Sequence, residues 1–363
     1  MRVLQIINSL GTGGAEKLLL ESLPLFYKEG LEVDLLLLDG NEYPFLVELE
    51  KKFKGKIFKI AKKKFVYNPL YIFKIKSYMK RYDLIHVHLF PALYLVSLTK
   101  KIFNLKVKTV YTEHNTHNKR RNIQIFNYLD KIFYLTYNKI ITIAEEVDSN
   151  LKKYLKSKDN SKFILINNGV NCEIYNNALP YAKSDFFNDD ALILIQVSSF
   201  RKQKDQITLV KAISKLPQKY KLLLVGTGPL ENECEELTTT LRLVDRVKFL
   251  GIRMDVPRLL KTSDITVLSS HYEGLSLSSI EAMASGKPFI ASNVSGLREI
   301  VKDAGVLFKE SDEDDLVKKI IKLSLDKEHY NLISEKCIKK SNEFDLRKMV
   351  KNYVKMYYNV CKE

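Results

Sequence analysis

Short apolar runs alternate with helical segments along most of this chain. In the first half the runs are RVLQIINSL, EVDLLLLDG, YDLIHVHLF, VKTVYTEHN and KIITIA. The pattern restarts with ALILIQVSSF, KLLLVGTGP, RVKFLGI, ITVLSS and PFIASN. Runs of this length, separated by helices, are typical of parallel sheets that are covered on both faces. We therefore predict an α/β protein with two doubly wound, Rossmann-like parallel-sheet domains.

A polar segment separates the two sets of runs. Within residues 175–190, the stretch NNALPYAKSDFFNDD carries a proline and shows no periodicity. A chain of 363 residues also exceeds the length at which one hydrophobic core keeps growing. We predict a first domain over residues 1–178, a second over 190–340, and a C-terminal helix within 341–363 that packs back toward the first domain.

The net charge of +16 is concentrated in the first half. Residues 1–170 hold 29 Lys and Arg against 16 Asp and Glu, and residues 51–108 hold sixteen cations and one acid. Such asymmetry indicates an anionic partner for that half, whether a membrane surface, a nucleic acid or an acidic substrate. The four cysteines are scattered without a C-x-x-C pair, which fits a reducing cytoplasm.

The sequence GTGGAE at residues 11–16 follows the first apolar run and opens a helical segment. Glycines at such a place let the backbone approach a phosphate at a helix N-terminus. Asp39 imitates the ribose-binding acid of a dehydrogenase, but Glu16 stands where the dinucleotide fingerprint has Gly or Ala. We therefore disfavour an NAD enzyme, and a simple tight turn stays the alternative.

The strongest constellation is HYEGLSLSSIEAMA at residues 271–284, directly after ITVLSS. Glu273 lies at the carboxyl end of the predicted strand, which faces the ligand crevice in open α/β sheets. Glu281 follows about two helical turns later, and the helix start between them offers free backbone N–H groups for a phosphate. The alternative makes Glu281 a solvated helix residue and Ser278 a cap.

These residues resemble glycosyltransferase family 4, the retaining nucleotide-sugar transferases of the GT-B fold. EGLSLSSIEAMASGKPFIASNVSGLREIV is similar to the Glu-x7-Glu region of that family. GTGGAEKLL, INNGVNCEIY, QKDQITLVKA and LLLVGTGPLENECEEL follow in the family's order, so the resemblance covers nearly the whole chain. It implies two domains that face each other across a cleft.

The resemblance also implies roles for individual residues. Glu281 would hold the ribose hydroxyls of the nucleotide, Glu273 the donor sugar, and Lys204 the diphosphate. Further donor contacts would come from the helix start, from the glycine turn of the other domain, and from a turn that contacts the base through its backbone: Leu275, Ser276 and Leu277; Gly13 and Gly14; Ile252 and Arg253.

The chain departs from the family at two places. Ser198-Ser199 stands where the family usually has Gly-Arg, so the customary diphosphate arginine is missing. We hypothesise that Arg201 reaches the same phosphate, while a solvated loop cation is the alternative. Ser276 replaces a common proline, which makes the helix start less rigid but leaves its N–H groups.

His114, at the end of VKTVYTEHN, matches a functional histidine that the family has near the donor sugar, and His117 is a weaker second choice. His86 and His88 share one face of a predicted strand, but no carboxylate or cysteine stands beside them at a recognised metal-ligand spacing. We predict no essential metal ion, because Lys204 and the helix start are able to neutralise the departing diphosphate.

We therefore predict a hexosyltransferase-like, retaining enzyme in polysaccharide or glycolipid synthesis. It would move a sugar from a nucleotide diphosphate, first of all a UDP-sugar, to a hydroxyl of a glycan or lipid-linked acceptor. An epimerase of the same fold is one alternative. A nucleic-acid-binding protein is another, and Phe53, Phe58, Phe65 and Tyr67 would then be its exposed aromatics. It would leave the donor-site residues without a purpose, so we expect no nucleic-acid partner.

Residues 51–67 interleave eight lysines with apolar side chains, and Lys119-Arg120-Arg121 add three cations. Each Lys or Arg near an anionic surface contributes about 1 kcal/mol. The family resemblance implies that the first domain binds the acceptor and that many acceptors are lipid-linked. We therefore predict a cytoplasmic protein that binds peripherally at the inner membrane face. A solvated lysine-rich face is the alternative.

Overall fold

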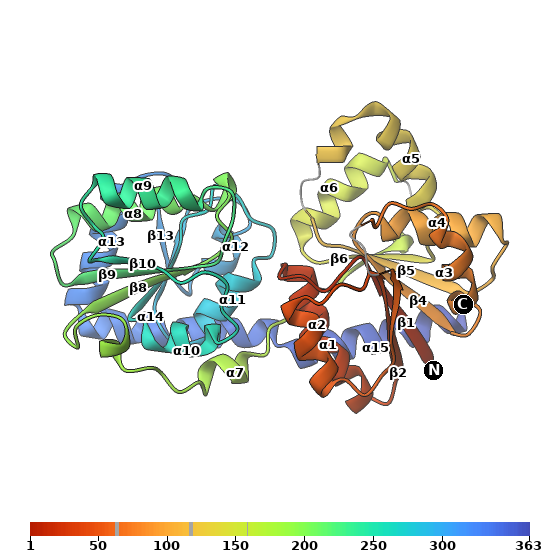
Figure 1. The fold of residues 1–363 in the computed structure, drawn as a ribbon, viewed down its shortest axis with the longest axis horizontal. Coiled ribbons are helices and arrows are strands. Elements are labelled where there is room, and N and C mark those ends of the chain that lie inside the picture. Colours follow the sequence, from red (N-terminus) through yellow and green to blue (C-terminus); the bar gives the residue numbers. More distant parts are fainter. Residues whose placement is uncertain (62–64, 116–118, 158) are drawn as a thin grey trace. The chain divides into compact units, whose positions relative to one another are not determined.

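The structure is a computed structural model that describes residues 1–61, 65–115, 119–157 and 159–363. The chain forms two compact units (Figure 1). The first comprises Met1–Gly169 and Leu346–Glu363, and the second comprises Val170–Asp345. The division falls after Gly169 and not at residue 178, because Val170 already bonds within the second unit. Its amide donates to the Phe344 carbonyl at 2.9 Å.

The first unit is built on a parallel sheet with the strand order β3-β2-β1-β4-β5-β6-β7. Its strands are β1 (Arg2–Ile7), β2 (Glu32–Asp39), β3 (Ile57–Ala61), β4 (Leu84–His88), β5 (Lys108–Glu113), β6 (Lys139–Thr142) and β7 (Phe163–Leu165). The five predicted runs all form strands, whereas β3 and β7 were not predicted. Its helices are α1 (Gly14–Lys28), α2 (Pro44–Lys52), α3 (Tyr71–Met79), α4 (Ala92–Ile102), α5 (Gln124–Tyr134), α6 (Glu145–Leu155) and α15 (Leu346–Lys362).

Alternating side chains of β1 and β4 serve different faces of this sheet. Leu4 and Ile85 belong to a buried apolar cluster with residues of α3, α4 and α6. Gln5 and His86 point to the opposite face and contact Tyr357 of α15. The C-terminal helix is therefore an integral layer of the first unit, where it also packs against α1.

The second unit holds a parallel sheet with the order β10-β9-β8-β11-β12-β13. Its strands are β8 (Leu192–Val197), β9 (Tyr220–Val225), β10 (Val247–Phe249), β11 (Ile265–Leu268), β12 (Phe289–Ser292) and β13 (Val306–Phe308). Its helices are α7 (Cys172–Asn176), α8 (Gln206–Lys215), α9 (Glu231–Thr240), α10 (Val256–Thr262), α11 (Leu277–Ala284), α12 (Arg298–Val301), α13 (Glu313–Leu325) and α14 (Lys327–Ser341). The five predicted runs again form strands, and β13 is an addition.

Both sheets have a topological switch point, where the strand order reverses. It lies between β1 and β4 in the first unit and between β8 and β11 in the second. Parallel strands end at one edge of the sheet, and the loops beyond a switch point form a ligand crevice. These two edges are therefore the places to search for a site. Among the described residues, no helix is long and apolar enough to cross a membrane.

Candidate active site

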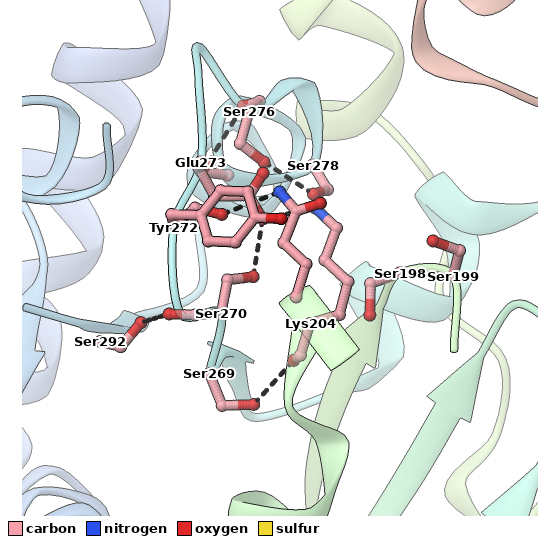
Figure 2. A network of polar contacts seen from close by, with 12 residues as sticks. Ser198, Ser199, Lys204, Ser269, Ser270, Tyr272, Glu273, Ser276, Ser278 and Ser292 are labelled. Atoms are coloured by element: carbon pink, nitrogen blue, oxygen red, sulfur yellow. Dashed lines mark hydrogen bonds and ion pairs between the residues drawn. The ribbon is translucent and has the colours of Figure 1, made fainter. Parts of the chain in front are cut away.

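The switch point of the second unit brings two predicted site residues together. Lys204 ends the 3-10 turn Lys202–Lys204 that follows β8, and Glu273 follows β11. Their side chains form an ion pair and point toward one another in Figure 2. The side chains are only 16% and 6% exposed, so water screens the pair weakly.

Glu273 is held from one side of its carboxylate. The hydroxyl of Ser270 donates to Oε1 at 2.6 Å, and Oε1 also accepts from Lys204. The other oxygen, Oε2, has no hydrogen-bond partner in the described part of the chain. This geometry leaves one carboxylate oxygen able to accept a hydrogen bond from a ligand hydroxyl.

Hydrogen bonds fasten the loops after β8 and β11 to one another. The amide of His271 donates to the Gln203 carbonyl at 2.8 Å, and the Gln203 side-chain amide donates to the Tyr272 carbonyl at 2.8 Å. Ser269 donates to the Asp205 carbonyl at 2.7 Å. The Lys204–Glu273 pair is thus fixed by backbone contacts that do not depend on its own charges.

Glu281 lies on α11 and is 4% exposed. The reading of Glu281 as a solvated helix residue is therefore wrong. The N-cap is Ser276 and not Ser278, and the two hydroxyls lie 3.0 Å apart. Since the Ser276 side chain makes no capping bond, the first N–H groups of the helix are available to an anion.

The predicted base-contacting turn follows β10. Ile252 is 50% exposed, and the Arg253 guanidinium forms a bidentate ion pair with Asp255 at 2.8 and 2.6 Å. Asp255 also accepts a 2.5 Å bond from Tyr181, and these bonds hold the pKa of its carboxyl below the usual range. The Arg253 side chain is engaged, so a contact from this turn would use the backbone.

Arg201 and the two serines lie on the loop after β8. The Ser198 hydroxyl accepts from the Gln196 and Gln206 side chains at 3.0 Å each. The Ser198 hydroxyl thus holds the loop itself together. Arg201 is exposed, which is compatible both with a contact to a phosphate and with a solvated loop cation.

His114, Gly13 and Gly14 belong to the first unit. Gly13 is the N-cap of α1, and the Glu16 carboxylate folds over it so closely that an added Cβ would overlap an oxygen. His114 follows β5 and lies 3.0 Å from His88. Burial lowers the pKa of His114 to about 4, so its ring is neutral at neutral pH. His117 lies outside the described residues.

Two arginines of the expected surface cluster are buried. Arg120 lies 3.1 Å from Asp130, and Arg121 lies 2.9 Å from Glu113. Their side chains are 7% and 10% exposed, so their treatment as membrane-facing cations was wrong. Arg120 thus ties the 3-10 turn Lys119–Asn122 to α5, and Arg121 ties it to the end of β5.

The described residues contain no group of three or more His, Cys, Asp or Glu side chains that is placed to hold a metal ion. His86 and His88 bond instead to hydroxyl and amide groups. Asp39, which imitated a ribose-binding acid, accepts from the Tyr43 hydroxyl at 2.9 Å within its own loop.

Ser270 and Gly296 contact Glu273 and were missed from the sequence. Gln5 and Tyr357, which contact His88 and His86, were missed as well. Gly296 has φ +82°, and a Cβ there would overlap the Glu273 carbonyl. A glycine in a strand-to-helix loop indicates a special backbone conformation. The sequence does not show that the Glu273 backbone lies against Gly296. Only the H-x-H alternation pointed to His88.

Comparisons with known proteins identify the family of this chain. Residues 181–340 match the family described as glycosyl transferases group 1, and residues 12–174 match glycosyltransferase family 4. The chain is 30% identical over 294 residues to N-acetyl-alpha-D-glucosaminyl L-malate synthase of Bacillus anthracis, covering 77% of this chain and 76% of that protein.

The chain is also 26% identical over 299 residues to the UDP-Gal:alpha-D-GlcNAc-diphosphoundecaprenol alpha-1,3-galactosyltransferase of Escherichia coli, covering 77% and 76% of the two proteins. Among solved structures, Anabaena HepE in complex with UDP and glucose is similar, with a TM-score of 0.83 at 21% identity. That match covers 99% of this chain and 100% of the other.

The two doubly wound parallel sheets are those of the GT-B class of glycosyltransferases. The chain belongs to the group 1 and family 4 glycosyltransferases, and it is a glycosyltransferase.

Replacement of Arg201 by Ala tests its phosphate role. A charge-assisted hydrogen bond contributes about 1.5–3 kcal/mol, so we expect the donor KM to rise by about tenfold to a hundredfold. Lys202→Ala, which changes the neighbouring exposed cation, is the control. An unchanged donor KM in Arg201→Ala would leave Arg201 as a solvated cation.

Replacement of Gly296 by Ala should displace the loop that carries Glu273. Gly30→Ala is the matched control, because Gly30 has φ +80° but no atom within 4 Å of its added Cβ. Both variants should lose about 1 kcal/mol of stability from backbone strain. Only Gly296→Ala should also lose transferase activity, measured as kcat, and equal kcat values would contradict the role of the contact.

Proposed function

We propose that this glycosyltransferase moves a sugar from a UDP-sugar to a hydroxyl of a glycan or lipid-linked acceptor, with retention of the anomeric configuration. The observation that carries the proposal is the Lys204–Glu273 pair at the switch point beside the start of α11. The UDP in the similar Anabaena structure and the diphosphoundecaprenol in the name of the E. coli relative support the donor and acceptor classes.

The chemistry follows from where charge develops. As the bond between the sugar and the diphosphate breaks, negative charge collects on the departing oxygens. Lys204 and the N–H groups at the start of α11 are fixed donors for that charge, in a site from which water is largely excluded. We therefore propose that the reaction needs no metal ion.

Glu273 has a different task in this proposal. Lys204 can exchange its contact with Glu273 for the phosphate oxygens when the donor binds. Ser270 continues to hold Oε1, so the carboxylate keeps its place while Oε2 accepts from a sugar hydroxyl. Glu281, buried on the same helix, would hold the ribose hydroxyls.

Thermal unfolding with UDP, GDP, ADP, CDP and dTDP should show the largest stabilisation with UDP, about 2.7 kcal/mol at a concentration a hundred times Kd. Two variants then separate nucleotide binding from transfer. Glu281→Ala should lose that stabilisation. Glu273→Ala should keep it and lose transfer by about a hundredfold or more.

Glu335→Ala serves as the control, because Glu335 is an exposed acid on α14 of the same unit. Stabilisation by another diphosphate alone would replace UDP in the proposal. NMR of the purified product should show the donor's anomeric configuration, and an inverted product would defeat retention. Turnover of donor without any acceptor would favour the epimerase.

We also propose that the first unit docks on an anionic membrane surface. Lys51, Lys52, Lys54 and Lys56 are exposed, and Phe65 and Tyr67 are each 60% exposed. Phe53 and Phe58 instead pack on Tyr27 and Tyr78, so the exposed aromatics follow the lysine run and do not interleave with it. Cations beside apolar side chains suit reversible attachment to a headgroup region.

Vesicle co-sedimentation tests this docking. The protein should bind vesicles that contain an anionic lipid at low salt and should be released at high salt. The double variant Lys54→Gln, Lys56→Gln removes about 2 kcal/mol, so binding should weaken about thirtyfold. Lys302→Gln with Lys336→Gln, two exposed lysines of the second unit, is the control. Equal binding to neutral vesicles would defeat the electrostatic argument.

A further inference from the structure

A chain of hydrogen bonds leads from His114 into the interior of the first unit. His114 Nε2 lies 3.0 Å from His88 Nδ1, and His88 Nε2 lies 2.8 Å from Gln5 Oε1. Gln5 Nε2 lies 3.0 Å from the Tyr357 hydroxyl, which lies 2.6 Å from His86 Nδ1. This series of hydrogen bonds therefore joins β1, β4, the end of β5 and α15.

The chemistry of each group gives this chain a direction. The Gln5 oxygen only accepts, so His88 must carry its proton on Nε2. The Nδ1 of a neutral His88 is then an acceptor, and His114 must donate from Nε2. The lone pair of His114 consequently lies on Nδ1, which has no hydrogen-bond partner among the described residues.

The donors and acceptors at the Tyr357 and His86 end of this series of hydrogen bonds follow in the same way. The Gln5 amide nitrogen only donates, so the Tyr357 hydroxyl accepts from it. The hydroxyl hydrogen is then satisfied by donating to His86 Nδ1. His86 then carries its proton on Nε2 and donates to Thr112 Oγ1 at 2.7 Å. With the Gln5 side-chain amide in this orientation every proton has one place, and no link requires a charged histidine.

Burial of these side chains favours neutral histidine rings with one tautomer each. Gln5 and Tyr357 are 0% exposed, His86 is 1% and His88 is 3% exposed, whereas His114 is partly exposed. Desolvation lowers the pKa of His86 and of His88 well below its usual value, so both rings stay neutral. With the Gln5 amide in this orientation, the other tautomer of His88 would leave buried polar groups without partners, at a cost of about 1–3 kcal/mol.

We propose that Gln5, His88 and Tyr357 are positioning residues that hold His114 as the Nε2–H tautomer, so that Nδ1 accepts a hydrogen bond from a hydroxyl of the substrate. The catalytic side of this inference rests on the proposed transferase function and on the role near the donor sugar that the family resemblance implies for His114. Histidines of this kind work through the nitrogen that the other hydrogen bond leaves free. The C-terminal helix thus contributes to the active site without touching the substrate.

A pair of tyrosine variants tests the network. Tyr357→Phe keeps the ring that packs against Phe26 but removes the hydroxyl at the centre of the chain. Tyr353→Phe is the matched control, because Tyr353 is buried on the same helix and its hydroxyl lies beyond His86, 3.4 Å from Thr112. Tyr357→Phe should lower kcat by about tenfold to a hundredfold and leave the donor KM unchanged, whereas Tyr353→Phe should change neither.

His88 offers a rescue test that does not depend on the tyrosines. His88→Leu removes the acceptor for His114 and should lower kcat at least as far as Tyr357→Phe. His88→Asn places an acceptor oxygen near the position of Nδ1, so it should recover part of kcat. Equal kcat in the two His88 variants would indicate a packing role and overturn the proposal.

Nitrogen NMR of protein with ¹⁵N-labelled histidine reads the tautomer directly, without substrate. The signal of His114 is assigned by its loss in His114→Gln. It should show the Nε2–H tautomer in the native protein and in Tyr353→Phe, and a mixture in Tyr357→Phe. The Nδ1–H tautomer or a charged ring at neutral pH would overturn the proposal.

The activity of His114→Gln separates the hypothesis that His114 is catalytic from the hypothesis that Gln5, His88 and Tyr357 position it. If that variant keeps full kcat while the tautomer is as expected, the assignment of His114 to catalysis fails and the network has no catalytic purpose. If His114→Gln loses kcat but Tyr357→Phe does not differ from Tyr353→Phe, His114 keeps its role and the positioning network is overturned.

Discussion

Parallel pairing around the two switch points is the constraint on which the rest of the structure depends. Since β8 and β11 are parallel neighbours, the chain leaves both at one edge of the sheet, and Lys204 meets Glu273 across 69 positions of sequence. In the first unit, β1, β4 and β5 run side by side in the same sense, so His88 and His114 meet at one edge. The apolar strands fix the sheet, and the sheet fixes which polar loops become neighbours.

The ion pair between Lys204 and Glu273 follows from this enforced proximity. A buried lysine without an anion would carry a large desolvation penalty, and a buried carboxylate would carry the same. Lys204 and Glu273 neutralise one another while the loop bonds of Gln203 and Ser269 keep their backbones in place. In the proposed mechanism, a diphosphate that enters this site replaces one anion at Lys204 with another.

Continuous apolar runs made ten strands predictable, but β3, β7 and β13 escaped. IFKIA lies within a lysine-rich run, whereas FIL and VLF span only three residues each, too short for a pattern to stand out. The Glu-x7-Glu spacing located Glu273 and Glu281, because both belong to one strand-to-helix unit. Gly296 and Tyr357 were out of reach, since each acts on a residue far away in sequence. The same limit hid the ion pairs that bury Arg120 and Arg121.

The C-terminal helix shows how packing and chemistry become a single requirement. Tyr353 and Tyr357 are four residues apart, so both rings lie on the buried face of α15. Buried hydroxyls need partners, and Tyr357 finds them on β1 and β4. A rotation of α15 by one residue, about 100°, would carry the Tyr357 hydroxyl away and leave Gln5 Nε2 and His86 Nδ1 unpaired in the core. The register of the helix is therefore specified by the same polar groups that orient His114, and a helix that packs correctly also sets the tautomer.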